Sequence, residues 1–171
     1  EMKGLIEKEV ISLRENDHCL LQSKYYEVFF TPAKDIPNVL REIGRLREIT
    51  FREVGEGTNE PLDLDDYDKY YHHMFLWDED AKCIAGAYRM GLGTEIYTKY
   101  GIDGFYLHDL FRFEPELYDM MSKSIEMGRA YIVKEYQQKP GQEGRRALEL
   151  HNLELEAELR TVPRFQKHAK V

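Results

Sequence analysis

The stretch that most constrains the fold of this chain covers residues 124–133 (Ser-Ile-Glu-Met-Gly-Arg-Ala-Tyr-Ile-Val). Its apolar residues favour a buried β-strand. The same stretch contains Glu126 and Arg129, and a charged side chain is costly to bury unless it is paired or used in chemistry. Side chains alternate along a strand, so positions three apart face opposite sides. The two charges can share one pocket only if a β-bulge separates them, and Gly128 would permit it.

Two plainer interpretations of this stretch stay open at the level of sequence. Glu126 and Arg129 also fit a structural ion pair, because such pairs occupy buried positions without doing chemistry. They fit an edge strand as well, in which both charges are exposed to water.

Length and composition restrict the class of protein. A chain of 171 residues with 42% hydrophobic and 33% charged residues is typical of one globular, soluble domain with a sizeable core. Twelve Tyr and eight Phe residues indicate either an apolar cleft or a β-rich core. The two cysteines, Cys19 and Cys83, do not make a disulfide framework or a zinc site, which fits a reducing, cytoplasmic compartment. No signal peptide or membrane span is expected.

The net charge of −8 is concentrated in residues 53–80, which contain ten acidic residues and one lysine. This segment argues against nucleic acid as a partner and is compatible with an amine substrate, although a solvated loop is the plain alternative. The run from Asp63 to Asp68 does not fit a calcium loop, which needs Gly at its sixth position and Glu at its twelfth. The adjacent His72 and His73 should face opposite sides of a strand, so we expect no metal site.

The hydrophobic patterns predict an α/β fold in which a mixed β-sheet is flanked by helices. Composition changes after Pro140, so the domain core is placed in residues 1–140 and a charged, leucine-bearing helical segment in residues 141–171. Asp35 is expected to cap the longest helix of the core. We expect strands over residues 25–30, 71–77, 83–90 and 124–133 and helices over 36–50 and 114–123. Residues 7–13 fit a short helix or a frayed lead-in. A loop is expected over 54–64 and a flexible excursion over 91–104.

Two arginines outside the opening stretch also need an explanation. Arg47, in Arg47-x-x-x-Phe51 at the end of the longest helix, could clamp a phosphate or carboxylate, or be an ordinary surface arginine. Arg89 ends a strand of small residues and needs an acidic partner. The candidate partners of Arg89 are Asp65, Asp68 and Glu126.

Taken in chain order, these motifs resemble those of two related families. One is the acyl-homoserine-lactone synthases, and the other is the bacterial acyl-carrier-protein-dependent N-acyltransferases of ornithine and related aminoacyl lipids, some labelled haemolysins. The surrounding sequence is more similar to the second family. Both have the fold of the Gcn5-related acyltransferases (GNAT), and the resemblance covers residues 25–140. The motifs are Arg47-x-x-x-Phe51, Asp65-x-x-Asp68, Tyr88-Arg89 and Glu126-x-x-Arg129.

The resemblance implies that a long acyl chain is transferred from a phosphopantetheine thioester to the amino group of an amino acid such as ornithine or glycine. It implies no tightly bound cofactor and no metal. Acyl carrier protein would be a partner, with a cytoplasmic location and peripheral contact with the inner membrane. Glu126 would accept the proton of the amine, and Asp65 or Asp68 would bind the amine. The residues implied to bind substrate are Arg47, Phe51, Arg89 and Arg129, with Arg89 and Arg129 either holding the acidic loop or binding the carboxylate of the amino acid.

Two alternatives remain beside this hypothesis. A signal synthase that uses S-adenosylmethionine has the same fold, but residues 54–61 lack the tryptophan expected there. A catalytically degenerate acyl-binding module is the other, because residues 141–171 depart from the pattern of the family.

Overall fold

The computed structural model describes residues 2–137, whose strands form one sheet in the order β1-β2-β3-β4-β5. All four pairings between these strands are antiparallel. The expected α/β architecture of a sheet flanked by helices is therefore confirmed, while the described strands do not mix directions. The strands are β1 (Cys19–Gln22), β2 (Tyr26–Pro32), β3 (His72–Asp78), β4 (Cys83–Leu92) and β5 (Ile125–Ile132).

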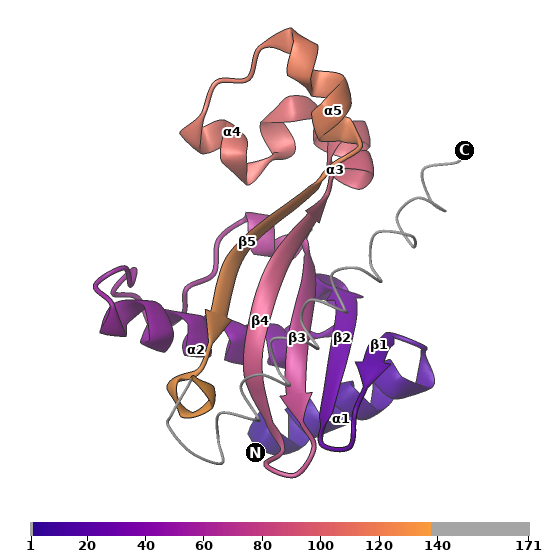
Figure 1. The fold of residues 1–171 in the computed structure, drawn as a ribbon, viewed down its shortest axis with the longest axis vertical. Coiled ribbons are helices and arrows are strands. Elements are labelled where there is room, and N and C mark those ends of the chain that lie inside the picture. Colours follow the sequence, from indigo (N-terminus) through magenta and orange to yellow (C-terminus); the bar gives the residue numbers. More distant parts are fainter. Residues whose placement is uncertain (1, 138–171) are drawn as a thin grey trace.

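Two long helices cover one face of this sheet, and three short ones lie beyond its end (Figure 1). Apolar residues of α1 and α2 pack on the strands around Phe29, Phe75 and Trp77, which are at most 1% exposed. No helix in the described part of the chain is both long and apolar enough to cross a membrane. The helices are α1 (Met2–Glu15), α2 (Pro37–Glu53), α3 (Gly93–Tyr100), α4 (Tyr106–Leu110) and α5 (Tyr118–Ser122).

The buried face of helix α2 includes a charged residue, Arg47, beyond its last buried apolar residue. Pro37 stands in the first turn, where its missing N–H is tolerated. Val39, Ile43 and Arg47 follow at a spacing of four, which places them on one side of the helix. Arg47 thus occupies the position that an apolar residue would take, and its side chain is 1% exposed.

The start of α2 is capped by α1, so the prediction that Asp35 caps it is wrong. No side chain of the flanking residues caps this terminus. The Glu9 carboxylate instead accepts hydrogen bonds from the backbone N–H groups of Asn38 and Val39, at 2.9 and 2.8 Å. A carboxylate at this position satisfies orphan donors and complements the helix dipole. It also joins two helices that the sequence pattern treats separately.

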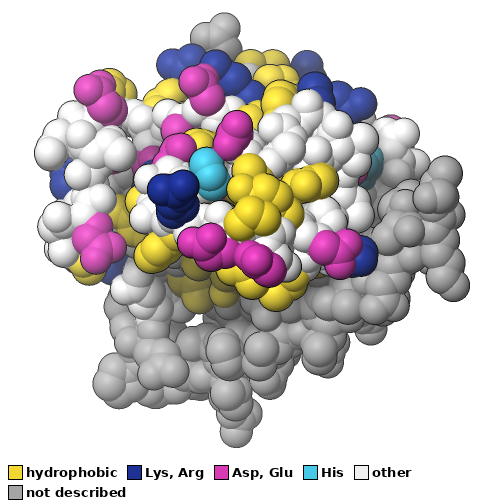
Figure 2. All heavy atoms as spheres, turned by 90° about the horizontal axis from the view of Figure 1, so that it is seen from above, with side chains coloured by type: hydrophobic (Ala, Val, Ile, Leu, Met, Phe, Trp, Pro, Cys, Tyr) yellow, Lys and Arg dark blue, Asp and Glu magenta, His cyan; other side chains and the backbone are white. Residues whose placement is uncertain are grey.

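The segment expected to be a flexible excursion, residues 91–104, is ordered, and that prediction is wrong. It contains the end of β4, all of α3 and a 3₁₀ turn over Gly101–Gly104. Ile96 and Phe105 are buried there in a cluster with Tyr71 and Met121. We call residues 93–123, from the start of α3 to the end of α5, the helical cap. Seen from above, apolar side chains are exposed on the cap among charged ones (Figure 2).

Other boundaries also differ from the sequence predictions. Residues 7–13, which fit a short helix or a frayed lead-in, belong to the longer helix α1, and β1 was missed because its four residues have no clear alternation. The helix expected over 114–123 consists of a 3₁₀ turn (Pro115–Leu117) followed by α5. The charged segment assigned to residues 141–171 lies outside the described residues.

The bulge expected in β5 is present one residue beyond its predicted position. Ala87 pairs with Tyr131 and Arg89 with Gly128, so β5 has one residue more than β4 between these pairs. Arg129, not Gly128, has the left-handed backbone, with φ of 50°. Close packing of β4 on β5 depends on Gly86, since a Cβ there would lie 2.7 Å from the Tyr131 carbonyl oxygen.

The Glu9 cap generates a stability prediction. Glu9→Ala should lower the free energy of unfolding by about 1 kcal/mol, because two backbone donors of α2 lose their acceptor. The measurement is urea unfolding followed by circular dichroism. The matched control is Glu15→Ala, at an exposed position of α1, the helix that carries Glu9. This control should change the free energy of unfolding by less than about 0.5 kcal/mol. Equal effects of the two variants would contradict the cap.

Candidate active site

Arg47 lies at the centre of a buried ionic network. Its Nη1 and Nη2 atoms donate to the two oxygens of the Asp68 carboxylate at 3.1 and 2.8 Å. Nη2 also donates to the carbonyl oxygen of Asp63, and Nε lies 3.2 Å from the Asp63 carboxylate. All three side chains are at most 3% exposed. This paired geometry is the kind that makes a buried charge tolerable.

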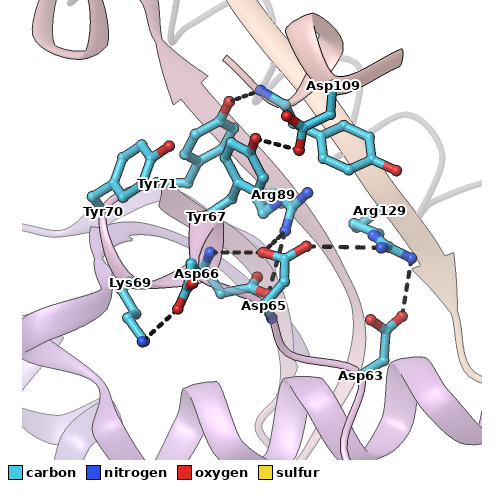
Figure 3. A network of polar contacts seen from close by, with 12 residues as sticks. Asp63, Asp65, Asp66, Tyr67, Lys69, Tyr70, Tyr71, Arg89, Asp109 and Arg129 are labelled. Carbon is cyan, nitrogen blue, oxygen red and sulfur yellow. Dashed lines mark hydrogen bonds and ion pairs between the residues drawn. The ribbon is translucent and has the colours of Figure 1, made fainter. Parts of the chain in front are cut away.

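Two further arginines reach the same acidic loop from the sheet (Figure 3). Arg89 of β4 contacts Asp65 at 2.6 Å and Asp68 at 3.3 Å. Arg129 of β5 contacts Asp63 at 3.3 Å and Asp65 at 3.8 Å. Three arginines thus face three aspartates, which we call the Arg–Asp network: Arg47, Arg89, Arg129, Asp63, Asp65 and Asp68.

The β5 bulge explains why Arg129 joins this network. Glu126 pairs with Gly91 and Gly128 with Arg89, so these positions lie on the face of β4 that carries Arg89. Regular alternation would point Arg129 to the opposite face. The extra residue and the left-handed backbone at Arg129 turn its guanidinium toward the acidic loop instead.

Asp68 is the acid of the network whose carboxylate accepts the most hydrogen bonds. Besides its arginines it accepts the Asp65 backbone N–H at 2.9 Å. Burial alone would raise the pKa of the Asp68 carboxyl, but the hydrogen bonds from Arg47 and the charges of Arg47 and Arg89 hold its pKa below the usual value. His73 is buried behind it, with Nε2 3.0 Å from the Asp68 carbonyl oxygen. His73 thus has a structural position behind the network.

The segment before the acidic loop is fixed to α2. Glu48 accepts hydrogen bonds from the Thr58 hydroxyl at 2.6 Å and the Asn59 backbone N–H at 2.9 Å. The Thr58 hydroxyl and amide, together with Arg52, lower the pKa of the Glu48 carboxyl to about 2. The loop expected over residues 54–64 is confirmed, and its attachment to α2 delivers Asp63 to the network.

Glu126 lies beside the network with a separate set of partners. Its carboxylate accepts the Tyr71 hydroxyl at 3.1 Å and the Leu107 backbone N–H at 3.5 Å. Tyr71 in turn accepts the Tyr106 backbone N–H at 2.9 Å. Burial raises the pKa of the Glu126 carboxyl, and the Tyr71 hydroxyl, the Leu107 amide and Arg89 lower it in part. A carboxylate whose pKa is raised in this way is a stronger base than an ordinary exposed carboxylate.

Tyrosine rings enclose the arginines between the network and Glu126. The Arg89 guanidinium lies 5.0–5.6 Å from the ring centres of Tyr67, Tyr71 and Tyr106. Arg129 lies 5.7 Å from the Tyr106 ring. The cap is tied to the acidic loop by Tyr67, whose hydroxyl donates to Asp109 at 2.5 Å. The cap is therefore part of the site.

The structure brings together six of the seven residues that the sequence predicted for the site. Arg47, Asp65, Asp68, Arg89 and Arg129 form the network, and Glu126 lies next to it. Phe51 does not join them, because it packs against the hydrophobic core under α2. Its substrate-binding role stays a prediction.

Sequence reasoning missed two residues of the site, Asp63 and Tyr71. Asp63 was considered only as part of a calcium loop, although its place in the acidic run was a usable signal. Tyr71 could not be chosen among twelve tyrosines. His72 and His73 face opposite sides, as expected, since His72 stacks on Phe30 at 4.9 Å. Residues 2–137 contain no group of three or more His, Cys, Asp or Glu side chains placed to hold a metal ion.

Comparison with known proteins identifies the family of this fold. A family profile described as "Acetyltransferase (GNAT) domain" matches residues 46–145. The chain belongs to the GNAT family. The matched region begins in α2 just before Arg47 and includes the acidic loop, the cap and β5, so the whole candidate site of this GNAT domain lies within it.

Two curated relatives are similar to this GNAT domain. Both are named "Glycine N(alpha)-acyltransferase"; one comes from Phocaeicola vulgatus and one from Bacteroides thetaiotaomicron. The first is 35% identical over 145 residues, which is 80% of this chain and 44% of the relative. The second is 35% identical over 116 residues, which is 65% of this chain and 34% of the relative. The chain thus spans less than half the length of either relative. No solved structure gave a significant match to it.

The network generates a second stability prediction. Asp68→Asn should lower the free energy of unfolding at pH 7 by about 3–5 kcal/mol, because it leaves the buried Arg47 without its main counter-charge. Because the folded-state pKa of Asp68 is lowered, its stabilisation is present above about pH 4 and is lost as the pH falls further. The variant should therefore lose less stability on acidification than the wild type.

The same motif supplies the control for this experiment. Asp66→Asn removes an exposed carboxylate whose partner, Lys69, is also exposed. Its effect should stay within about 0.5 kcal/mol. Denaturant unfolding at pH 7 and at about pH 3, below the usual pKa of an aspartate, measures both variants. A loss for Asp68→Asn as small as that for Asp66→Asn would contradict a central role for the buried pair.

Proposed function

We propose that this protein is an N-acyltransferase that moves an acyl group from a phosphopantetheine thioester to the amino group of a glycine-type amino acid. The observation that carries the proposal is Glu126, a buried carboxylate with a raised pKa, placed beside a bulged strand within a GNAT domain. The names of the two relatives support glycine as the first acceptor to test. Acyl carrier protein or coenzyme A would carry the thioester.

The proposed reaction forms one C–N bond and breaks one C–S bond. An ammonium group is not nucleophilic, so the amine first gives one proton to solvent. As the neutral nitrogen attacks the thioester carbonyl, Glu126 accepts the next proton from nitrogen, directly or through one water. The tetrahedral intermediate then collapses, and the sulfur leaves as a thiol with that proton. The products are an N-acyl amino acid and free phosphopantetheine thiol.

The bulged strand β5 is a candidate source of hydrogen-bond donors for the oxyanion of the tetrahedral intermediate. Among the described strands, β5 is at the edge of the sheet, so its outer backbone groups pair with none of them. Backbone N–H groups at such an edge can donate to the oxyanion of the intermediate. The long acyl chain, the carrier protein and peripheral membrane contact remain expectations from the family resemblance.

The Arg–Asp network would keep these parts in place. Asp68 and Arg47 are buried and saturated by their mutual contacts, which favours a positioning role for both. Asp65 is 30% exposed and stays the candidate for binding the amine.

The first test measures thiol release from acyl carrier protein or acyl coenzyme A with glycine or ornithine. Glu126→Gln should lower kcat by about 10²–10⁴-fold, the usual contribution of a general base. Glu116→Gln, at an exposed position on the cap, is the matched control and should keep the wild-type rate. A Glu126→Gln variant with the wild-type rate would exclude the general base, and no thiol release with any amino acid would contradict the proposed function.

The second test uses the pH dependence of the rate. Since only ionised Glu126 accepts a proton, kcat/KM should fall as the pH drops through its raised pKa. Tyr71→Phe removes a hydrogen bond to the ionised form, so the pKa of Glu126 should rise further and this fall should move to higher pH. Tyr118→Phe, on the cap, should leave the profile unchanged. An unmoved profile in Tyr71→Phe would show that the hydroxyl does not act through Glu126.

A further inference from the structure

A cavity of about 270 Å³ lies at the end of the sheet opposite to the candidate active site. Its walls come from α1, α2 and the ends of β3 and β4 that a hairpin joins, and we call it the hairpin cavity. Figure 1 shows this hairpin at the lower end of the sheet and the helical cap beyond the upper end. At about 3.3 Å per residue, Cys83 in the cavity lies roughly 20 Å along β4 from Arg89 of the network. The hairpin cavity is therefore separate from the residues assigned to acyl transfer.

The buried wall of the hairpin cavity is apolar. Ile6, Trp77 and Ile84 line it and are at most 7% exposed. Met2 lines it as well and is 40% exposed, so this side of the cavity faces water. An apolar cavity of about 150 Å³ is enough to take up a benzene molecule. The hairpin cavity is larger, so its walls suit an apolar group such as a hydrocarbon chain.

The rim of the hairpin cavity has charged side chains that differ in their partners. Glu42 is paired with Arg45 at 2.6 Å, and Lys82 is paired with Glu79. Lys3 is exposed, makes no ion pair in the described part of the chain, and has one backbone oxygen at 3.5 Å from its Nζ. The positive charge of Lys3 is thus left for an anion at the mouth of an apolar cavity.

We propose that the hairpin cavity binds a molecule with an apolar chain that ends in a carboxylate. The chain packs against Trp77 and Ile84, and the carboxylate accepts a hydrogen bond from Lys3. Burial of the chain supplies most of the binding free energy, while the lysine selects an anion over a cation. This inference goes beyond the proposed function, because binding in the hairpin cavity needs no reaction at Glu126.

A free fatty carboxylate and the N-acyl amino acid of the proposed reaction share this chemistry. The probes are therefore sodium decanoate and N-decanoylglycine, each kept below its micelle concentration and added to the whole 171-residue chain. Trp77 is the only tryptophan of the sequence, so its fluorescence reports on the cavity. At least one probe should give a saturable change. Tighter binding of N-decanoylglycine would assign the cavity to the reaction product, and tighter binding of decanoate to a free fatty carboxylate, and either order supports the site.

Two controls test the role of Lys3. Lys3→Gln should raise the Kd of the tighter-binding carboxylate about two- to fivefold, the effect of an exposed ion pair. Lys8→Gln, at another exposed position of α1, should leave this Kd unchanged. Decyltrimethylammonium has the same chain with a cationic head group and should bind more weakly by at least the factor seen for Lys3→Gln. Equal affinity for the cation and the carboxylate, or equal effects of the two lysine variants, would overturn the proposal.

Alkylation of the cysteines locates the bound probe without any substitution. Cys83 lines the cavity, whereas Cys19 lies in β1 at the edge of the sheet, and both are partly exposed. Burial raises the pKa of both thiols, so labelling with iodoacetamide is carried out at alkaline pH. A probe at ten times its Kd should slow labelling of Cys83 about tenfold and leave that of Cys19 unchanged, as measured by peptide mass spectrometry. Unprotected Cys83 at this concentration, or no saturable fluorescence change with either probe, would overturn the proposal.

Discussion

The buried pair of Arg47 and Asp68 holds together the parts from which the candidate site is built. Arg47 comes from the buried face of α2, and both oxygens of Asp68 are bound by it. Asp68 also contacts Arg89 of β4, so one carboxylate connects helix, loop and sheet. Charges removed from water must be matched closely, and few arrangements of these three elements do so. The pair therefore fixes where the acidic loop lies.

The proposed base is kept apart from this network although it lies beside it. Glu126 takes its hydrogen bonds from Tyr71 and from the start of α4 rather than from an arginine. An arginine in direct contact would hold the carboxyl firmly ionised and make it a weaker base. The tyrosine and the backbone amide orient the carboxylate while burial keeps its pKa raised. The two groups of charges thus differ in environment and in role.

The helical cap couples these groups because it contributes to both. It supplies the Tyr106 and Leu107 amides near Glu126, and Asp109 accepts the hydroxyl of Tyr67 in the acidic loop. Gly91 makes room for this arrangement, since a Cβ there would lie 2.6 Å from the Tyr71 ring. The cap was expected to be partly flexible, and local sequence could not show that its aromatic residues pack on a distant loop. A movement of the cap would therefore alter the surroundings of Glu126 through two hydrogen bonds, from the Leu107 N–H to Glu126 and from the Tyr106 N–H to Tyr71.

The sequence by itself predicted the fold class, because alternation and helical spacing are local properties, and it allowed a bulge in β5 as one of three interpretations. The six residues of the candidate site were indicated by the resemblance of their motifs to those of a known family. It did not determine that Glu9 caps α2, that Asp63 and Tyr71 belong to the candidate site, or that Phe51 packs against the core. Those contacts join residues far apart in the chain. The sequence cannot distinguish one Glu, Asp or Tyr from another of its type, because the packing of the elements decides which of them meet. Only the tertiary structure decided that Arg129 is the accessible arginine of the network, with 25% of its side chain exposed, since burial depends on which segments cover a side chain.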